Sequence, residues 1–127
     1  MFRNLFVFIF LTLSGCILYV DYTPGSYNTY RSSVSLESPY ISCTYDAYWD
    51  LSEWTFEIYA DSFLGPSEVF EVGFWINDYD YQYMEYLGGG WWYRNFVSNY
   101  YDCDRYYHFD FLAVDYDGYE GFYTLNW

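Results

Sequence analysis

Positively charged side chains are the scarcest feature of this 127-residue sequence. Its four basic residues are all arginines, whereas 18 residues are acidic, so the formal net charge is −14 at pH 7. Nucleic-acid binding draws its affinity from basic groups that neutralise phosphates, and anionic lipid headgroups attract the same groups. The composition therefore excludes nucleic acid as a partner and excludes electrostatic docking on a membrane.

Histidine and the common catalytic motifs are also lacking. His108 is the single histidine, so a multi-histidine metal cluster is excluded, and a Ser-His-Asp triad would have to pass through this one residue. The sequence has no nucleophile elbow, phosphate-binding loop or zinc-protease helix. We therefore predict that the protein is not an enzyme.

A sustained helical period is absent after the first 15 residues, and among good helix formers lysine is missing and alanine is scarce. Aromatic residues make up 30% of the chain, and Tyr, Phe and Trp favour strands. Short alternating segments separated by turn residues indicate an all-β antiparallel sandwich of seven to eight strands. The expected strands are Arg31–Glu37, Tyr40–Asp46, Trp54–Asp61, Glu68–Ile76, Tyr81–Leu87, Trp91–Val97, Tyr106–Asp115 and Gly121–Leu125.

The N-terminus has the organisation of an export signal. Arg3 precedes an apolar run over residues 5–11, which is too short for a transmembrane helix of about 20 residues. The following Leu13-Ser14-Gly15-Cys16 resembles the lipobox of bacterial lipoproteins. This resemblance implies that residues 1–15 are a cleaved signal peptide and that Cys16 carries a diacylglyceryl lipid.

The predicted lipid anchor also defines the remaining regions of the chain. Residues 16–29 have no sustained alternation and are expected to be a lipidated tether of roughly 20 Å. Residues 30–127 are expected to be the sandwich domain. The predicted location is the bacterial cell envelope. An aspartate directly after the lipidated cysteine would resemble an inner-membrane retention signal, but this position is Ile17, which is compatible with the outer membrane.

The three cysteines support the same interpretation. An odd number of cysteines in an exported protein needs an explanation. Lipidation of Cys16 would provide one, because it takes this cysteine out of the count of free thiols. Cys43 and Cys103 then remain as a pair in an oxidising compartment. A disulfide is expected between them, and two free buried thiols are the alternative.

The domain resembles immunoglobulin-like sandwiches over residues 31–127. Cys43, Trp54 and Tyr101-Asp102-Cys103 are similar to the Cys…Trp…Tyr-x-Cys layout of true immunoglobulin domains. Separately, Tyr107–Asp115 is similar to the penultimate strand of fibronectin-III-like sandwiches. The two alignments place that strand differently, so they cannot share one register. The resemblance implies the fold and leaves the function open.

One acidic turn is a candidate calcium site. Asp115, Asp117 and Glu120 are spaced so that their carboxylates could converge on a hard cation, with help from Asp78 and Asp80 of another loop. The alternative is an Asp-Gly hairpin whose aspartates bond the local backbone. No other cofactor is expected.

A second candidate is an aromatic binding surface at Trp91, Trp92 and Tyr93, which follow three glycines. Neighbouring strand residues point to opposite faces, so at most one of the two tryptophans belongs to the core. The expected function is a non-catalytic binding or structural role at the envelope, with an envelope protein or a glycan as partner. The alternative is a carbohydrate-binding module that uses surface Trp and Tyr.

Overall fold

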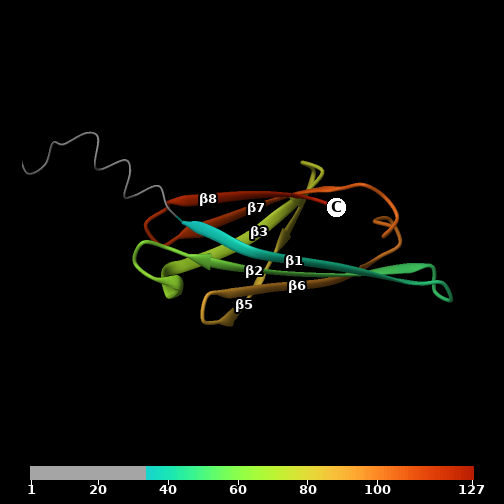
Figure 1. The fold of residues 1–127 in the computed structure, drawn as a ribbon, viewed down its shortest axis with the longest axis horizontal. Helices are drawn as coiled ribbons and strands as arrows, with labels where there is room; N and C mark the ends of the chain where they lie inside the picture. Colours follow the sequence, from blue (N-terminus) through green and yellow to red (C-terminus); the bar gives the residue numbers. More distant parts are fainter. Residues whose placement is uncertain (1–33) are drawn as a thin grey trace, which may run out of the picture. The chain divides into compact units, whose positions relative to one another are not determined.

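The computed structural model describes residues 34–127, which form two four-stranded antiparallel sheets packed face to face (Figure 1). A short 3-10 turn, η1 (Pro66–Glu68), precedes the third strand. The strands are β1 (Ser35–Asp46), β2 (Leu51–Asp61), β3 (Val69–Ile76), β4 (Asp80–Tyr83), β5 (Glu85–Gly88), β6 (Trp91–Ser98), β7 (His108–Asp115) and β8 (Glu120–Asn126).

The order of the strands identifies the type of sandwich. One sheet has the order β1-β2-β6-β5 and the other has the order β4-β3-β7-β8. In an immunoglobulin sandwich the sheets have the orders A-B-E-D and C-F-G, and an additional C′ strand can extend the second sheet. If β1 to β8 are lettered A, B, C, C′, D, E, F and G in chain order, the first sheet reads A-B-E-D and the second reads C′-C-F-G. The predicted all-β immunoglobulin-like sandwich is confirmed.

Alternation of side chains builds the core between the sheets. On β2, Trp54, Phe56 and Ile58 point inward and are almost completely buried. The ring of Phe56 stacks on Phe74 of β3 at 4.3 Å between centroids and meets Phe109 of β7 at 5.0 Å. These contacts join the two sheets through aromatic rings, and burial of large rings is a dominant stabilising contribution in such cores.

The alternation of β3 is interrupted at its first residues. Strict alternation would place Phe70 on the core face with Val72, but Phe70 is exposed and Val69 is buried instead. The reason is a bulge between Val69 and Glu71 in the pairing with β7. An extra residue in one strand shifts the alternation by one position.

Two predicted strands at the start of the domain are one strand. β1 pairs with β2 along its whole length, with a bulge between Glu37 and Tyr40. Pro39 lies in this bulge, where its missing N–H interrupts the pairing without ending the edge strand. The expected start at Arg31 lies outside the described residues.

One predicted strand, Tyr81–Leu87, is two strands in different sheets. β4 pairs with β3, whereas β5 pairs with β6. Between them Met84 is buried, and its backbone N–H donates to the Val72 carbonyl at 2.9 Å. The chain crosses from one sheet to the other at this residue, close to where Arg94 Nη2 of β6 donates to Gln82 Oε1 of β4 at 3.1 Å.

The predicted disulfide between Cys43 and Cys103 is confirmed, with Cα atoms 5.5 Å apart. Its place in the fold is not the one that the Cys…Trp…Tyr-x-Cys layout implies. Cys43 lies on β1, Trp54 lies on β2 and Cys103 lies in the loop between β6 and β7. The bond therefore ties an edge strand to a loop. The regular penultimate strand, β7, begins at His108, so Cys103 precedes it.

The predicted signal peptide, the lipidated Cys16 and the tether over residues 16–29 lie outside the described residues. Within residues 34–127, no helix has the length and apolar character that a bilayer crossing requires.

We expect the double variant Cys43→Ala/Cys103→Ala to lose about 4 kcal/mol of unfolding free energy, because the bond closes a loop between residues 60 positions apart. Urea unfolding of the variant and of the unreduced parent measures this difference. Mass spectrometry after alkylation without reductant is the control, and it should find both cysteines unmodified in the parent. A loss below about 1 kcal/mol would contradict the prediction, since ordinary surface changes have effects of that size.

Candidate functional site at the loop end

Three connections of the sandwich meet at one end of the domain. They are the β1–β2 turn (47–50), the β3–β4 turn (77–79) and the long β6–β7 loop (99–107). The long loop lines one hollow together with residues of the β1–β2 hairpin and a second hollow together with residues of the β3–β4 turn. We call these three connections the loop end.

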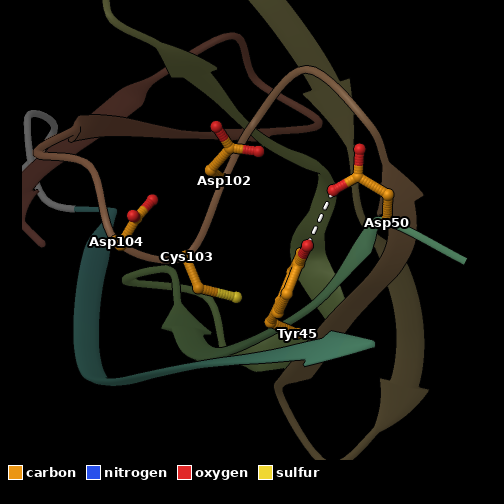
Figure 2. A pocket seen from close by; sticks show the side chains of 5 residues that line it. All are labelled: Tyr45, Asp50, Asp102, Cys103 and Asp104. Carbon is orange, nitrogen blue, oxygen red and sulfur yellow. Dashed lines mark hydrogen bonds between the residues drawn. The ribbon is translucent and has the colours of Figure 1, made fainter. Parts of the chain in front are cut away.

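The first hollow is acidic, and Figure 2 shows the side chains around it. Tyr45 Oη donates a hydrogen bond to Asp50 Oδ1 at 2.7 Å. This bond to a carboxylate raises the pKa of Tyr45 above its usual value, so the phenol stays a donor. The hollow has a volume of about 340 Å³ and is lined by Tyr45, Asp50, Asp102, Cys103 and Asp104. Its three carboxylates favour positively charged ligands.

The second hollow is lined mainly by tyrosines and has a volume of about 280 Å³. Tyr101 Oη donates to Asp80 Oδ2 at 3.0 Å, and burial together with this bond raises the pKa of Tyr101 to about 12. Arg105 Nη2 lies 3.1 Å from Asp102 Oδ2. The lining residues are Ile76, Asn77, Tyr79, Tyr100, Tyr101, Arg105, Tyr106 and Tyr107.

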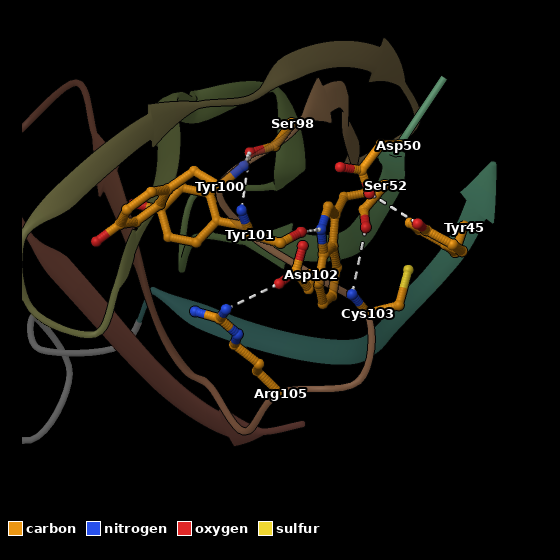
Figure 3. A network of polar contacts seen from close by, with 10 residues as sticks. Tyr45, Asp50, Ser52, Ser98, Tyr100, Tyr101, Asp102, Cys103 and Arg105 are labelled. Atoms are coloured by element: carbon orange, nitrogen blue, oxygen red, sulfur yellow. Dashed lines mark hydrogen bonds and ion pairs between the residues drawn. The ribbon is translucent and has the colours of Figure 1, made fainter. Parts of the chain in front are cut away.

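Hydrogen bonds with side chains of β2 and β6 hold the β6–β7 loop in place (Figure 3). Ser98 Oγ accepts the backbone N–H groups of Tyr100 and Tyr101, each at 2.9 Å. The indole Nε1–H of Trp54 donates to the Tyr101 carbonyl at 2.8 Å. Ser52 Oγ, which is buried on β2, accepts the N–H of Cys103 at 3.3 Å.

Trp127 and the disulfide also hold the β6–β7 loop in place. The backbone N–H of Trp127 donates to the Tyr107 carbonyl at 2.8 Å, and its indole Nε1–H donates to the Cys103 carbonyl at 3.0 Å. Cys103 is also bonded to Cys43 of β1. The loop therefore carries its side chains on a braced backbone, which is the condition for a preorganised site.

Aromatic side chains project from all three connections of the loop end. Five of them expose between 68% and 94% of their surface: Tyr48, Trp49, Tyr79, Tyr100 and Tyr106. In the β1–β2 turn, Asp46 Oδ1 accepts the N–H groups of Tyr48 and Trp49 at 2.9 and 3.3 Å. The rings are therefore exposed to solvent from turns of defined geometry. The fold brings these five exposed rings to one end of the sandwich, which makes that end a candidate interaction surface.

A group of possible metal ligands lies beside the loop end, where the β3–β4 turn meets the start of β7. His108 begins β7, and its Nε2 lies 3.1 Å from Asp78 Oδ1 and 3.5 Å from Asp110 Oδ2. Asp78 is in the β3–β4 turn, where Asn77 and Asp78 have φ values of 49° and 67°. Among the described residues, these three are the one cluster of His, Cys, Asp and Glu side chains close enough to share an ion.

The predicted aromatic surface at Trp91, Trp92 and Tyr93 lies elsewhere. Trp92 is buried in the core, whereas Trp91 is 41% exposed on the outer face of the first sheet, where its ring lies 5.6 Å from that of Tyr59. Tyr93 is partly buried. The two tryptophans therefore point to opposite faces, as strand geometry requires. Trp91 begins β6, whereas the loop end follows the last residue of that strand, Ser98.

The predicted calcium residues form a turn at the far end of β7. Asp115 is buried, and its Oδ1 accepts the N–H groups of Asp117 and Tyr119, each at 2.9 Å, while its Oδ2 accepts from Ser62 Oγ at 3.4 Å. Asp117 and Glu120 are exposed. Asp78 and Asp80 lie by the opposite end of β7, so they are not neighbours of this turn. Calcium binding at Asp115, Asp117 and Glu120 stays a prediction, and Asp115 has a structural role.

The loop end was missed by the sequence analysis, although the sequence contains a signal for it. Tyrosine and aspartate occur side by side at Tyr45-Asp46, Asp78-Tyr79 and Tyr101-Asp102, each in or next to a connection between two strands. Each pair alone is unremarkable for a turn. Only the folded chain brings the three connections to one end of the sandwich.

We expect Asp115→Ala to lower the unfolding free energy by about 1–3 kcal/mol, because two part-buried N–H groups lose their acceptor. Asp117→Ala is the matched control and should stay within about 0.5 kcal/mol of the parent. Urea unfolding of the parent and of the two variants measures these differences in unfolding free energy. A calcium site at this turn predicts a higher melting temperature in calcium chloride than in chelator. The hairpin alternative, in which both Asp115 oxygens accept hydrogen bonds, predicts equal melting temperatures.

No protein-family model matches this chain, and neither the curated proteins nor the solved structures contain a significant match.

Proposed function

We propose that this protein is an exported, lipid-anchored protein of the bacterial cell envelope with a non-catalytic binding role, and that the loop end binds a basic surface of a partner protein. The observation that carries the proposal is the set of five exposed aromatic side chains on the braced connections. Tyrosine and tryptophan provide large, rigid contact area at low entropic cost, which is why binding loops of immunoglobulin domains are rich in them.

The charge of the loop end defines the chemistry of the partner. Six aspartates lie in or beside its connections and one arginine, Arg105, accompanies them. The aspartates are Asp46, Asp50, Asp78, Asp80, Asp102 and Asp104. Lysine and arginine side chains of a partner would meet both carboxylates and aromatic faces, and the two kinds of contact reinforce each other.

Attachment to the membrane is proposed through the lipid on Cys16. The chain has few basic side chains that anionic headgroups could attract. The lipid chains would therefore supply the free energy of membrane binding, at about 0.8 kcal/mol for each buried methylene. The loop end would then be presented at the envelope surface by a domain that needs no contact of its own with the bilayer.

A carbohydrate-binding role is the second candidate, and one observation favours it. Trp91 and Tyr59 place neighbouring rings on the outer face of the first sheet, and Glu57 and Tyr93 are cross-strand neighbours there. Exposed aromatic faces with polar groups beside them suit sugar rings. This surface and the loop end are separate, so variants can distinguish the two roles.

We expect a photoreactive benzoyl-phenylalanine at Tyr106 to cross-link a protein with a basic surface in the native envelope. The same group at Tyr116, an exposed tyrosine in the β7–β8 turn away from the loop end, is the matched control and should give no such product. Added salt should reduce the yield, because screening weakens the attraction between exposed charges.

With the cross-linked partner purified, Tyr79→Ala/Tyr106→Ala should weaken binding by about tenfold or more, the loss typical of aromatic hot spots. Equal cross-linking from positions 106 and 116 would contradict the proposal. Glycan-array binding that is lost in Trp91→Ala and kept in Tyr79→Ala/Tyr106→Ala would favour the carbohydrate-binding role instead.

Metabolic labelling with an alkyne fatty acid tests the anchor. We expect the parent to be labelled and to sediment with membranes, and Cys16→Ser to lose both properties, because no other cysteine is placed to receive the lipid: Cys43 and Cys103 are bonded to each other. Cys43→Ala/Cys103→Ala is the control and should remain labelled. Membrane sedimentation of Cys16→Ser would contradict the lipid anchor.

A further inference from the structure

We propose that Asp78, His108 and Asp110 form a binding site for a divalent transition-metal ion, with zinc as the preferred ion. Neither the fold nor the proposed partner binding requires this site, and it does not rest on the proposed function. It lies where the β3–β4 turn meets the start of β7.

The three donor atoms are already spaced as ligands of one ion. His108 Nε2 is 3.1 Å from Asp78 Oδ1 and 3.5 Å from Asp110 Oδ2, and all three atoms lie within 4.8 Å of one another. Zinc binds imidazole nitrogen and carboxylate oxygen at about 2.0–2.2 Å in a tetrahedron, so two of its ligand atoms are about 3.4 Å apart. An ion could therefore enter with little rearrangement of these side chains.

Contacts outside the cluster orient two of its members. Asn77 and His108 exchange two hydrogen bonds: Asn77 Oδ1 accepts the His108 N–H, and the Asn77 N–H donates to the His108 carbonyl, both at 3.0 Å. This clamp fixes the turn that carries Asp78 against the start of β7. Thr124 Oγ1 of β8 donates to Asp110 Oδ1 at 2.5 Å. The other oxygen of Asp110 faces His108, and such outer contacts are typical of metal-binding carboxylates.

The donor set selects the kind of ion. Calcium and magnesium prefer six or more oxygen ligands, whereas an imidazole with carboxylates suits zinc and its neighbours. Three protein ligands leave at least one position for water or for a group of a bound molecule. Asp78 is exposed and His108 and Asp110 are half-buried, so ions can reach the site from solvent.

A simple ion pair is the competing interpretation of the same geometry. A protonated His108 between two carboxylates would be a surface ion pair, and such pairs contribute about 0–1 kcal/mol. The ion pair predicts no metal affinity. The two interpretations therefore differ in a direct binding measurement.

The test is a calorimetric titration of zinc chloride into the full-length chain carrying Cys16→Ser, which removes a thiol that would compete for zinc. We expect one site, with affinity lowered about tenfold or more in His108→Ala and in Asp110→Asn. Glu85→Gln removes an exposed carboxylate on β5, outside both candidate metal sites, and should leave the affinity unchanged. Millimolar calcium or magnesium should not displace the zinc.

Copper provides a second measurement on the unsubstituted cluster. Because His108 is the single histidine of the chain, electron paramagnetic resonance of bound Cu²⁺ should show coupling to one imidazole nitrogen. The proposal is overturned if zinc does not bind at millimolar concentration, if His108→Ala binds as well as the parent, or if the copper spectrum shows no imidazole nitrogen. A His108→Ala chain that fails to fold leaves the copper spectrum of the parent to decide.

Discussion

The buried indole of Trp54 is the contact on which the core and the loop end both depend. Its ring packs edge-on against Tyr107 and Trp127, at 5.5 and 5.2 Å between centroids, and its Nε1–H donates to the Tyr101 carbonyl. Cys43, which pairs with Trp54 across β1 and β2, is bonded to Cys103 of the same loop. One side chain thus fills the core below the loop and satisfies a backbone acceptor of the loop itself. A change at this residue would loosen the packing and the candidate site together.

The arrangement lets a rigid sandwich display side chains that would otherwise be costly to expose. Rings such as Tyr79 and Tyr106 lie almost entirely in water, where they bring a tendency to associate. The aspartates beside them and the large net negative charge oppose self-association. Because the loop backbone is already held by hydrogen bonds, the proposed binding of a partner would lose less conformational entropy. The bonds between the core and the loop would then serve both stability and binding.

Local patterns predicted the strands well where pairing is regular and failed where it is interrupted. Alternation along β2 groups Trp54 and Phe56 on one face, and that face is the core, because period two is a property of any extended strand. Phe70 departs from the alternation of β3 because of a bulge that arises only in the pairing with β7. Met84 could not be recognised as the crossing between sheets, since its surroundings come from both of them. Trp91 and Trp92 were correctly expected on opposite faces, yet the exposed tyrosines of the loop end were not singled out.

The sequence by itself determined the all-β class, the alternation along a regular strand such as β2 and the two cysteines that bond, because strand propensity, alternation and cysteine parity are properties of the chain. Only the tertiary structure decided that Cys43 ties β1 to a loop and that Asp78, His108 and Asp110 lie together. It also decided that three separate Tyr-Asp turns meet at one end. The physical reason is that these contacts join residues far apart along the chain. Their proximity follows from strand order and register, which depend on how two sheets pack around a shared core.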